Sequence, residues 1–454
     1  MNRYLSGWKP ISGVYSGPLP RGLGLDPASS IATAPHLADH TRHQIALRLL
    51  PFLFLLYVLN YLDRTNVAFA AIGMSRELGF SDRVFGLGAG IFFVSYIALQ
   101  IPGAVLAERW SARRMIALSL VAWGSLTVLT SLVRTPSHLY LARFLLGAAE
   151  GGFFPGVVVY LSHWFLHEDR AKATSNFMGA IPLSSVLGSP LAGLILGYEW
   201  LGWKGWRWLF VIEGLPVVLL GIIAYFFLTD WPKDAYWLTP DQRLWIEDKL
   251  EEQQIASTSE RATVGQALKS GTVRTLAMSL FFAYILTYTF VFWFPTILKR
   301  HSGLSDLHVG MLGALPFVAY FLAMQIGGWH SDKTCERRWH TAIPLFIGAA
   351  ALLAATAPVP SLAYFMTVFS LVGVAASYVS IAWAIPTEIL SRSMAPTAVG
   401  LINATASIAG FAGPYAFGYL YSRTGSFSAG LLMMMLAAVI GGLLILRLPA
   451  RSRV

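Results

Sequence analysis

Two stretches of this chain repeat one pattern, Gly103-Ala-Val-Leu-Ala-Glu108-Arg109-Trp-Ser-Ala-Arg113-Arg114 and Gly327-Gly-Trp-His-Ser-Asp332-Lys333-Thr-Cys-Glu-Arg337-Arg338. Each stretch ends a long apolar run, and each places an acid, a base and a pair of arginines at the same distances from its first glycine. These glycines are 224 residues apart, about half of the 454-residue chain. A repeat of this length indicates two similar halves that follow one another in the same direction.

The amino-acid composition indicates whether water or lipid surrounds these two halves. Hydrophobic residues make up 56% of the chain and charged residues only 12%, against roughly a quarter charged in a typical soluble domain. Apolar runs of about 20 residues, the length that crosses a hydrocarbon core, recur from Leu47 to Leu446. Backbone groups in lipid must be satisfied within the chain, and these runs lack the alternation of barrel strands. We therefore expect an all-α integral membrane protein, which excludes an ordinary soluble enzyme.

The apolar runs divide into two sets of six predicted transmembrane helices, separated by a charged stretch. This stretch contains Trp231-Pro-Lys-Asp-Ala-Tyr-Trp-Leu-Thr-Pro-Asp-Gln, followed by a predicted amphipathic surface helix. Five parts are thus predicted: a disordered cytoplasmic N-terminal tail (1–43), a six-helix bundle (44–228), a cytoplasmic linker (229–271), a second six-helix bundle (272–446) and a cytoplasmic C-terminal tail (447–454).

Lysine and arginine predict the orientation, because they are enriched in cytoplasmic loops. With both termini inside, 23 of the 33 basic residues lie in cytoplasmic segments, eight lie outside and two lie within predicted helices. We therefore expect a multi-pass protein of the cytoplasmic (inner) membrane with both termini cytoplasmic. The net charge of +10 is dispersed among loops, which favours this topology over nucleic-acid binding.

The repeated loops resemble the signature of the major facilitator superfamily, which lies between helices 2 and 3 and again between helices 8 and 9. The resemblance implies twelve helices in two six-helix bundles. The chain departs from the signature in spacing and has Ser111-Ala112 near the usual glycine. The resemblance also implies a conformational latch, which would consist of Glu108, Arg109, Arg113, Asp332, Lys333 and Arg337. The alternative is that these charges only mark the cytoplasmic boundary.

Three further stretches resemble the anion:cation symporters of that superfamily, which carry tartrate, phthalate, hexuronate, galactonate and related acids. They are Asn60-Tyr-Leu-Asp63-Arg64-Thr-Asn66, Arg143-Phe-Leu-Leu-Gly-Ala-Ala-Glu150-Gly-Gly-Phe-Phe-Pro155-Gly and Gly205-Trp-Arg-Trp-Leu-Phe-Val-Ile-Glu213-Gly-Leu-Pro216. The resemblance covers about residues 45–446. It implies proton-carrying acids at Asp63 and Glu150, anion-binding arginines at Arg64 and Arg143, and substrate contacts at Tyr96 and Asn403. Ser407 stands where family members often carry a second asparagine, and we include it among the substrate-binding candidates.

Four ionisable residues in apolar runs support this assignment independently: Asp63, Arg64, Arg143 and Glu150. Burying a charge in a membrane costs a few kcal/mol or more, so such residues usually face a bundle interior and mark a pathway. Two acids and two bases are neutral together, and protonating one acid leaves a positive site that favours an anion. The alternative for Asp63 and Arg64 is a structural ion pair with a neighbouring helix. Glu213 is expected near a helix N-terminus, where an acid is stabilising without any role in transport.

The function expected from these features is secondary active transport. The leading hypothesis is proton-coupled symport (uptake) of a small organic anion by alternating access; the alternative is exchange or efflux by the same fold. A receptor or embedded enzyme is disfavoured because no soluble domain or catalytic constellation is present. No Walker A loop is present, and Cys335 is the single cysteine. We expect no catalytic residue, cofactor or metal, and a monomer embedded in the lipid bilayer.

Overall fold

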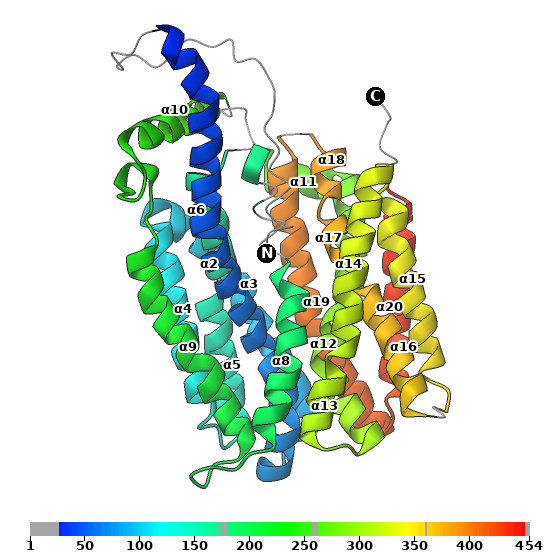
Figure 1. Ribbon diagram of the computed structural model, residues 1–454. Helices are drawn as coiled ribbons and strands as arrows, with labels where there is room; N and C mark the ends of the chain where they lie inside the picture. The colour runs from blue at the N-terminus through cyan, green and yellow to red at the C-terminus, as the bar shows by residue number, and fades with distance from the viewer. Residues whose placement is uncertain are drawn as a thin grey trace.

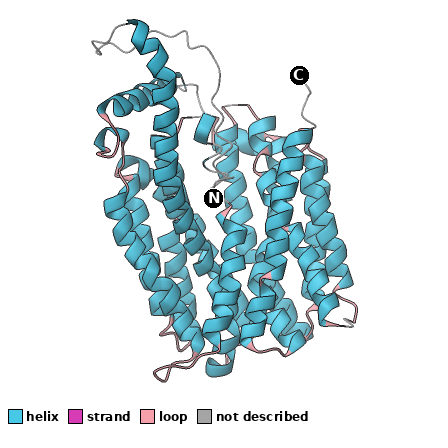
Figure 2. Ribbon diagram, viewed as in Figure 1, coloured by secondary structure: helices cyan, strands magenta, loops and turns pink. Residues whose placement is uncertain are grey.

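The computed structural model describes residues 27–166, 168–170, 173, 179–256, 262–358, 361–391 and 393–449. Within these ranges the chain is almost entirely helical, as Figure 2 shows, and its one β-type pairing is an isolated bridge between Trp200 and Trp203. The remaining residues, including 1–26 and 450–454 of the two predicted tails, lie outside the described residues.

Among the described residues, the first half of the chain contains six helical spans, one of which is interrupted. The interrupted span consists of two helices, which meet at Gly151 and Gly152 and together form the segment Pro136–Trp164. The helices of this half are α2 (Pro27–Leu78), α3 (Asp82–Arg109), α4 (Ala112–Thr130), α5 (Pro136–Glu150), α6 (Phe153–Trp164), α8 (Ala180–Leu196) and α9 (Gly205–Phe227).

The second half also contains six spans, two of which are divided into shorter helices. Its helices are α12 (Gly271–Ser302), α13 (Asp306–Gly313), α14 (Leu315–Thr334), α15 (Arg338–Ala354), α16 (Leu362–Ala375), α17 (Tyr378–Ala382), α18 (Ile385–Ile389), α19 (Ala395–Thr424) and α20 (Ser428–Leu446). Between the halves lie η1 (Pro232–Asp234), α10 (Pro240–Ala256) and α11 (Val264–Lys269). Figure 1 shows α10 lying across the end of the first half, beside the N-terminal part of α2.

These helices account for the twelve predicted spans. Among the described residues, nine helical segments are long and apolar enough to cross a bilayer. The shorter apolar helices α8 and α15 and the 30-residue α19 occupy the other three places. The prediction of an all-α membrane fold is therefore confirmed.

Local sequence determines where several of these helices begin and end. The Thr135 side chain accepts a hydrogen bond from the His138 amide, and Pro136 follows at the first helical position of α5, where its fixed φ is favourable. At the other end of a helix, α12 stops at Gly303, whose φ of 64° is left-handed and suits glycine.

The two halves repeat one internal packing. In the first half α4 packs along α9, where Gly124 and Gly214 let the backbones approach so closely that a Cβ on Gly124 would lie 2.9 Å from the Gly214 carbonyl oxygen. In the second half the corresponding helices α15 and α20 pack together, and a Cβ on Gly442 would lie 2.6 Å from the Phe346 ring. Small residues thus bring helices together in lipid.

The halves are pressed together at the end away from the linker. There α8 meets α13 through Gly193 and Gly310, and a Cβ on Gly193 would lie 2.7 Å from the Cα of Gly310. The start of α3 meets α19, where a Cβ on Gly86 would lie 2.9 Å from the Pro414 carbonyl oxygen. Such backbone contacts leave no space for a solute between α8 and α13 or between the start of α3 and α19.

The first helix begins earlier than predicted. Residues 27–43 were expected to belong to a disordered tail, but they form the start of α2. Side chains near residue 43 explain part of this difference, because they bind segments far away in the chain. Arg42 pairs with Asp169 at 2.6 Å, and the Gln44 amide donates to the Trp237 carbonyl at 2.9 Å. The prediction of disorder is therefore wrong for residues 27–43.

Candidate functional site

A buried ion pair joins two spans at the centre of the first half. The Nε of Arg64 on α2 lies 2.8 Å from Oε2 of Glu150, at the end of α5. The Asn60 amide donates to the same oxygen, also at 2.8 Å. Arg64 is 6% exposed and Glu150 is fully buried. A buried pair of this kind is stable only while both charges are present, because removing one leaves the other without compensation.

Tyr96 lies against this ion pair. The Arg64 guanidinium carbon is 4.5 Å from the centroid of the Tyr96 ring, within the range of a cation–π contact. Tyr96 is buried on α3, and its ring stacks on that of Phe92. The structure thus brings three of the predicted site residues, Arg64, Glu150 and Tyr96, into one cluster.

A second charged region of the first half consists of Asp63 and Arg143. Both are 1% exposed. Asp63 accepts a hydrogen bond from the Asn66 amide at 3.0 Å, and Arg143 directs its Nε at the Gly88 carbonyl at 3.4 Å. Within the described part of the chain, neither terminal nitrogen of Arg143 has a hydrogen-bond partner. Burying a guanidinium group without hydrogen-bond partners costs free energy. The charge of Arg143 provides a positive electrostatic potential inside the bundle.

Small residues between Arg143 and Glu150 let α5 approach α3 closely. A Cβ on Gly147 would lie 2.1 Å from the Phe92 carbonyl oxygen, so α5 touches the backbone of α3 directly. A Cβ on Gly103 would likewise lie 2.4 Å from the Cα of Gly152. These contacts place the charges of α5 next to α3 without intervening side chains.

A cavity of about 40 Å³ lies between the two halves and reaches this cluster. Arg64 lines it, whereas Arg143, Asn403 and Ser407 are not among its lining residues. A cavity of this size holds a few water molecules, so an organic anion enters only if the halves separate. The lining residues are Tyr61, Arg64, Thr65, Phe93, Ile181, Ser185, Tyr284, Thr287, Tyr288, Val291, Phe292, Phe317, Tyr320 and Val379.

Four tyrosines in this lining, one from the first half and three from the second, are not among the site residues that the sequence predicted. Tyr61 comes from α2, Tyr284 and Tyr288 from α12, and Tyr320 from α14. The spacing of four between Tyr284 and Tyr288 places both on one face of α12, a signal that could have identified them. Tyrosine hydroxyls can donate to a carboxylate or hydroxyl group.

The two candidates on α19 occupy different positions. The Asn403 amide donates to Gln100 Oε1 of α3 at 3.2 Å, so it bridges the two halves. Ser407, one turn further along α19, is buried. Asn403 therefore links the two halves in this conformation.

Glu213 differs from its predicted setting. It is the ninth residue of α9 and is 5% exposed, so it lies well inside the helix and not at its N-terminus. It lies close enough to Asp63 and Asn66 to interact with both electrostatically. The prediction that Glu213 lies near a helix N-terminus is therefore wrong. The buried cluster consequently contains three acids, Asp63, Glu150 and Glu213, and two bases.

The repeated loops make ion pairs within their own halves. In the first loop, the Arg113 amide donates to Asp230 Oδ1 at 2.9 Å, while Glu108 and Arg109 are exposed. In the second loop, Arg337 pairs with Asp332 at 2.5 Å and with Glu388 of α18 at 3.0 Å. The Lys333 Nζ lies 5.2 Å from the centroid of the Trp329 ring. These contacts anchor each loop to its own half in this conformation.

Comparisons with known proteins agree with this architecture. A family model described as Major Facilitator Superfamily matches residues 53–305 and 276–454. Over 400 residues the chain is 39% identical to a protein of Agrobacterium vitis named as a tartrate transporter, covering 87% of this chain and 91% of that protein. It is 35% identical to a protein of Pseudomonas putida named as the metabolite transport protein NicT, covering 90% and 94% of the two chains.

Two other proteins extend this comparison. The chain is 32% identical to a quinolone resistance transporter of Acinetobacter baumannii, covering 87% of this chain and 92% of that protein. A bacterial homolog of the human lysosomal transporter Spinster, solved in an inward-facing and unoccupied conformation, has a TM-score of 0.67 at 20% identity. That match covers 89% of this chain and 95% of the solved chain. The chain therefore belongs to the major facilitator superfamily of membrane transport proteins, and its relatives agree with the resemblance to the anion transporters of that superfamily.

Proposed function

We propose that this protein takes up a small organic anion together with protons by alternating access. The substrate class is a carboxylate such as a sugar acid, a tartrate-like diacid or an aromatic acid. Relatives named as tartrate and metabolite transporters support this class. The buried carboxylates of the first bundle carry the protons.

The observation that carries the proposal is the Arg64–Glu150 ion pair beside the central cavity. While Glu150 is ionised, its carboxylate occupies Arg64. When Glu150 takes up a proton, the ion pair is lost, and the planar guanidinium can bind a substrate carboxylate through two hydrogen bonds. The proton thus favours anion binding, and by linkage the bound anion favours protonation.

The charge of the buried cluster supports a resident proton. Three carboxylates and two guanidinium groups would carry a net charge of −1 if all were ionised, and a buried uncompensated charge is costly. Asp63 interacts electrostatically with Arg143, and Glu150 pairs with Arg64, whereas Glu213 interacts with Asp63 and Asn66. Glu213 is therefore the carboxyl group that holds this proton, and Glu150 exchanges the transported one.

The proposed orientation places the linker in the cytoplasm, with both termini cytoplasmic and the protein in the inner membrane as a monomer. The tight contacts between α8 and α13 then lie on the outer side. The same division into two six-helix bundles, a linker at 229–271 and two terminal segments is retained, with the first bundle now extended by the helical residues 27–43. Loop residues Glu108, Arg109, Arg113, Asp332, Lys333 and Arg337 would latch the linker side when the bundles rock.

Exchange or efflux is the alternative, and two observations favour it. A quinolone resistance transporter is among the relatives, and four tyrosines line the central cavity, a lining suited to aromatic compounds. These two observations indicate what kind of substrate binds, and they do not indicate whether its transport is coupled to protons. Proton dependence and direction therefore distinguish the two functions.

Uptake into proteoliposomes tests the proposal. Purified protein is reconstituted and given labelled sugar acids, tartrate-like diacids and aromatic acids, with or without an inward proton gradient. Symport predicts that the gradient drives accumulation above the external concentration. If a proton gradient drives none of these anions while an internal counter-anion does, symport fails and exchange stands.

A further inference from the structure

A larger cavity, separate from the central one, opens at the end of the protein away from the linker. Its volume is about 420 Å³ and its walls come from α2, α3 and α12. It therefore lies between the two halves, on the side that the proposed orientation places outside. The lining residues are Val67, Ala68, Ala71, Ile72, Ser75, Arg76, Asp82, Phe85, Ala89, Phe292, Trp293, Thr296, Lys299, Arg300 and Gly303. We refer to it as the outer cavity.

The lining of the outer cavity carries three cations and one carboxylate: Arg76, Lys299, Arg300 and Asp82. Both carboxylate oxygens of Asp82 accept hydrogen bonds from Arg300, whose two terminal nitrogens lie 2.6 and 3.2 Å from them. Lys299 pairs with Asp306 at 2.6 Å, and Arg76 lies 3.9 Å from the other oxygen of that aspartate. One carboxylate thus serves two cations, and the cavity keeps a positive excess.

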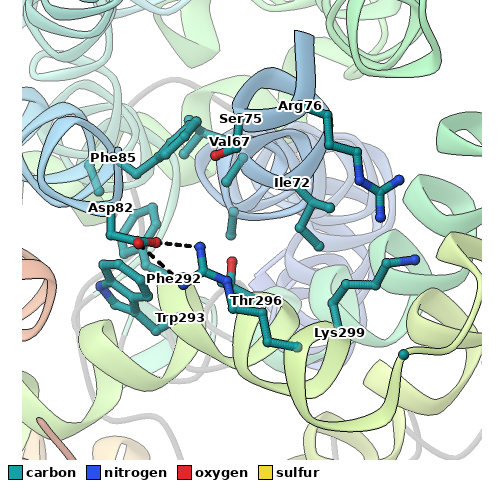
Figure 3. A pocket seen from close by; sticks show the side chains of 15 residues that line it. Val67, Ile72, Ser75, Arg76, Asp82, Phe85, Phe292, Trp293, Thr296 and Lys299 are labelled. Carbon is teal, nitrogen blue, oxygen red and sulfur yellow. Dashed lines mark hydrogen bonds and ion pairs between the residues drawn. The ribbon is translucent and has the colours of Figure 1, made fainter. Parts of the chain in front are cut away.

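Arg76 is the cation best able to accept a new partner. Its side chain is 63% exposed, and its single ion-pair distance of 3.9 Å is long for a direct hydrogen bond. Figure 3 shows Arg76 and Lys299 together on one side of the cavity, although they come from α2 and α12. Two cations converging from different helices, with one carboxylate between them, can bind a further carboxylate by charge-assisted hydrogen bonds.

The opposite wall is apolar and aromatic. Phe85, Phe292 and Trp293 line it, as Figure 3 shows, and the Thr296 hydroxyl lies between this wall and the cations. Phe292 also lines the central cavity. Its ring therefore forms part of the partition between the two cavities, and the outer cavity lies next to the proposed transport route.

We propose that the outer cavity is a second binding site, for a small organic anion that combines a carboxylate with an apolar or aromatic body. The carboxylate binds Arg76 and Lys299, and the body packs on Phe292 and Trp293. Its role in substrate capture rests on the proposed function, whereas binding itself does not. Because the anion competes with Asp306 for both cations, occupation weakens the Arg76–Asp306 and Lys299–Asp306 pairs, the first of which joins the two halves at this end.

Equilibrium binding of radiolabelled benzoate to the purified full-length protein tests this site, with benzamide as the neutral analogue. The double variant Arg64→Gln/Glu150→Gln removes both charges of the central pair and leaves the outer cavity intact. In that background we expect saturable benzoate binding that benzamide does not displace. Adding Arg76→Gln and Lys299→Gln should weaken it about tenfold or more, as loss of charge-assisted bonds predicts.

Arg134→Gln is the matched control, because Arg134 is exposed at the same end but does not line the outer cavity. It should leave benzoate affinity unchanged. The proposal is overturned if the Arg64→Gln/Glu150→Gln protein binds no benzoate, or if the outer substitutions weaken binding no more than Arg134→Gln. If benzoate binds as expected while wild-type proteoliposomes move no organic anion, the proposed transport function fails and the outer site stands.

Discussion

Arg64 and Glu150 are 86 residues apart in the chain, yet the guanidinium Nε of one lies 2.8 Å from the carboxylate of the other, inside the first bundle. The pair is buried, and its arginine lines the central cavity. In the proposed mechanism, a substrate anion competes with the Glu150 carboxylate for Arg64, and protonation of Glu150 releases Arg64 for the anion.

Replacing Glu150 with glutamine should uncouple transport from protons. Glutamine keeps the shape of the protonated acid but carries no exchangeable proton, so Arg64 remains available to anions at every pH. We expect gradient-driven accumulation in proteoliposomes to fall by at least about tenfold, while exchange of labelled for unlabelled anion continues. Glu251→Gln, which changes an exposed acid of α10, serves as the control. Accumulation by Glu150→Gln at the wild-type level would show that another group carries the proton.

The Arg64–Glu150 ion pair should also contribute to the free energy of unfolding. Arg64→Gln leaves Glu150 buried without its partner, a change that costs about 3–5 kcal/mol. The double variant Arg64→Gln/Glu150→Gln removes both charges and should recover most of that loss. Thermal unfolding of the single and double variants measures the coupling between the two residues. Additive losses in the double variant would mean that the two side chains do not depend on each other.

Glu213→Gln should be tolerated. If Glu213 holds the resident proton, glutamine copies its neutral form, so transport should stay within about twofold of wild type and stability within about 1 kcal/mol. Glu213→Ala also removes packing and should be the more destabilising change, by about 1–3 kcal/mol. Uptake assays measure the change in transport, and thermal unfolding measures the change in stability. Loss of proton-driven accumulation in Glu213→Gln, with exchange retained, would instead assign the transported proton to Glu213.

Gly193→Ala should disturb closure of the end away from the linker. The added methyl would lie 2.7 Å from the Cα of Gly310 and 2.9 Å from the Asp306 carbonyl oxygen. Backbone atoms cannot move aside as a side chain can, so the halves must separate there. Gly197→Ala is the control, because its methyl would meet neighbours only at 3.7 Å or beyond.

Side-specific labelling measures this shift. Cys335 is exposed and is the single cysteine of the chain, so Cys335→Ser gives a background without thiols. Thr65→Cys then places one thiol in the lining of the central cavity. An impermeant maleimide should label it faster from the side away from the linker in Gly193→Ala than in Gly197→Ala. Equal rates in the two variants would mean that the Gly193–Gly310 contact does not control access.

The sequence predicted much of the fold because membrane helices leave a strong local signal. Apolar runs of spanning length and short polar turns located the spans, and the repeated loops at Gly103 and Gly327 indicated the two halves. The boundary at residue 43 was wrong, because contacts such as Arg42 with Asp169 depend on tertiary structure. Local composition contains no information about a partner 127 residues away.

The candidate site was predictable in its parts and less so in its connections. Intramembrane charge identified Asp63, Arg64, Arg143 and Glu150, since burying such groups is costly. Which acid meets which arginine is a property of helix packing, so the Arg64–Glu150 pair and the bridge from Asn403 to Gln100 emerged only from the structure. Glu213 was misjudged because it is the ninth residue of α9, beyond the first turn that an N-terminal acid stabilises.

The most direct test of the central claim is the movement of protons with the anion in one experiment. Proteoliposomes containing an entrapped pH-sensitive dye receive an inward gradient of an anion that the uptake panel has identified, with no imposed pH difference and with protein-free liposomes as the control. Symport predicts that anion entry acidifies the lumen in wild type, and that Glu150→Gln exchanges the labelled anion without acidification. Anion entry into wild-type proteoliposomes with no change in internal pH would contradict the account.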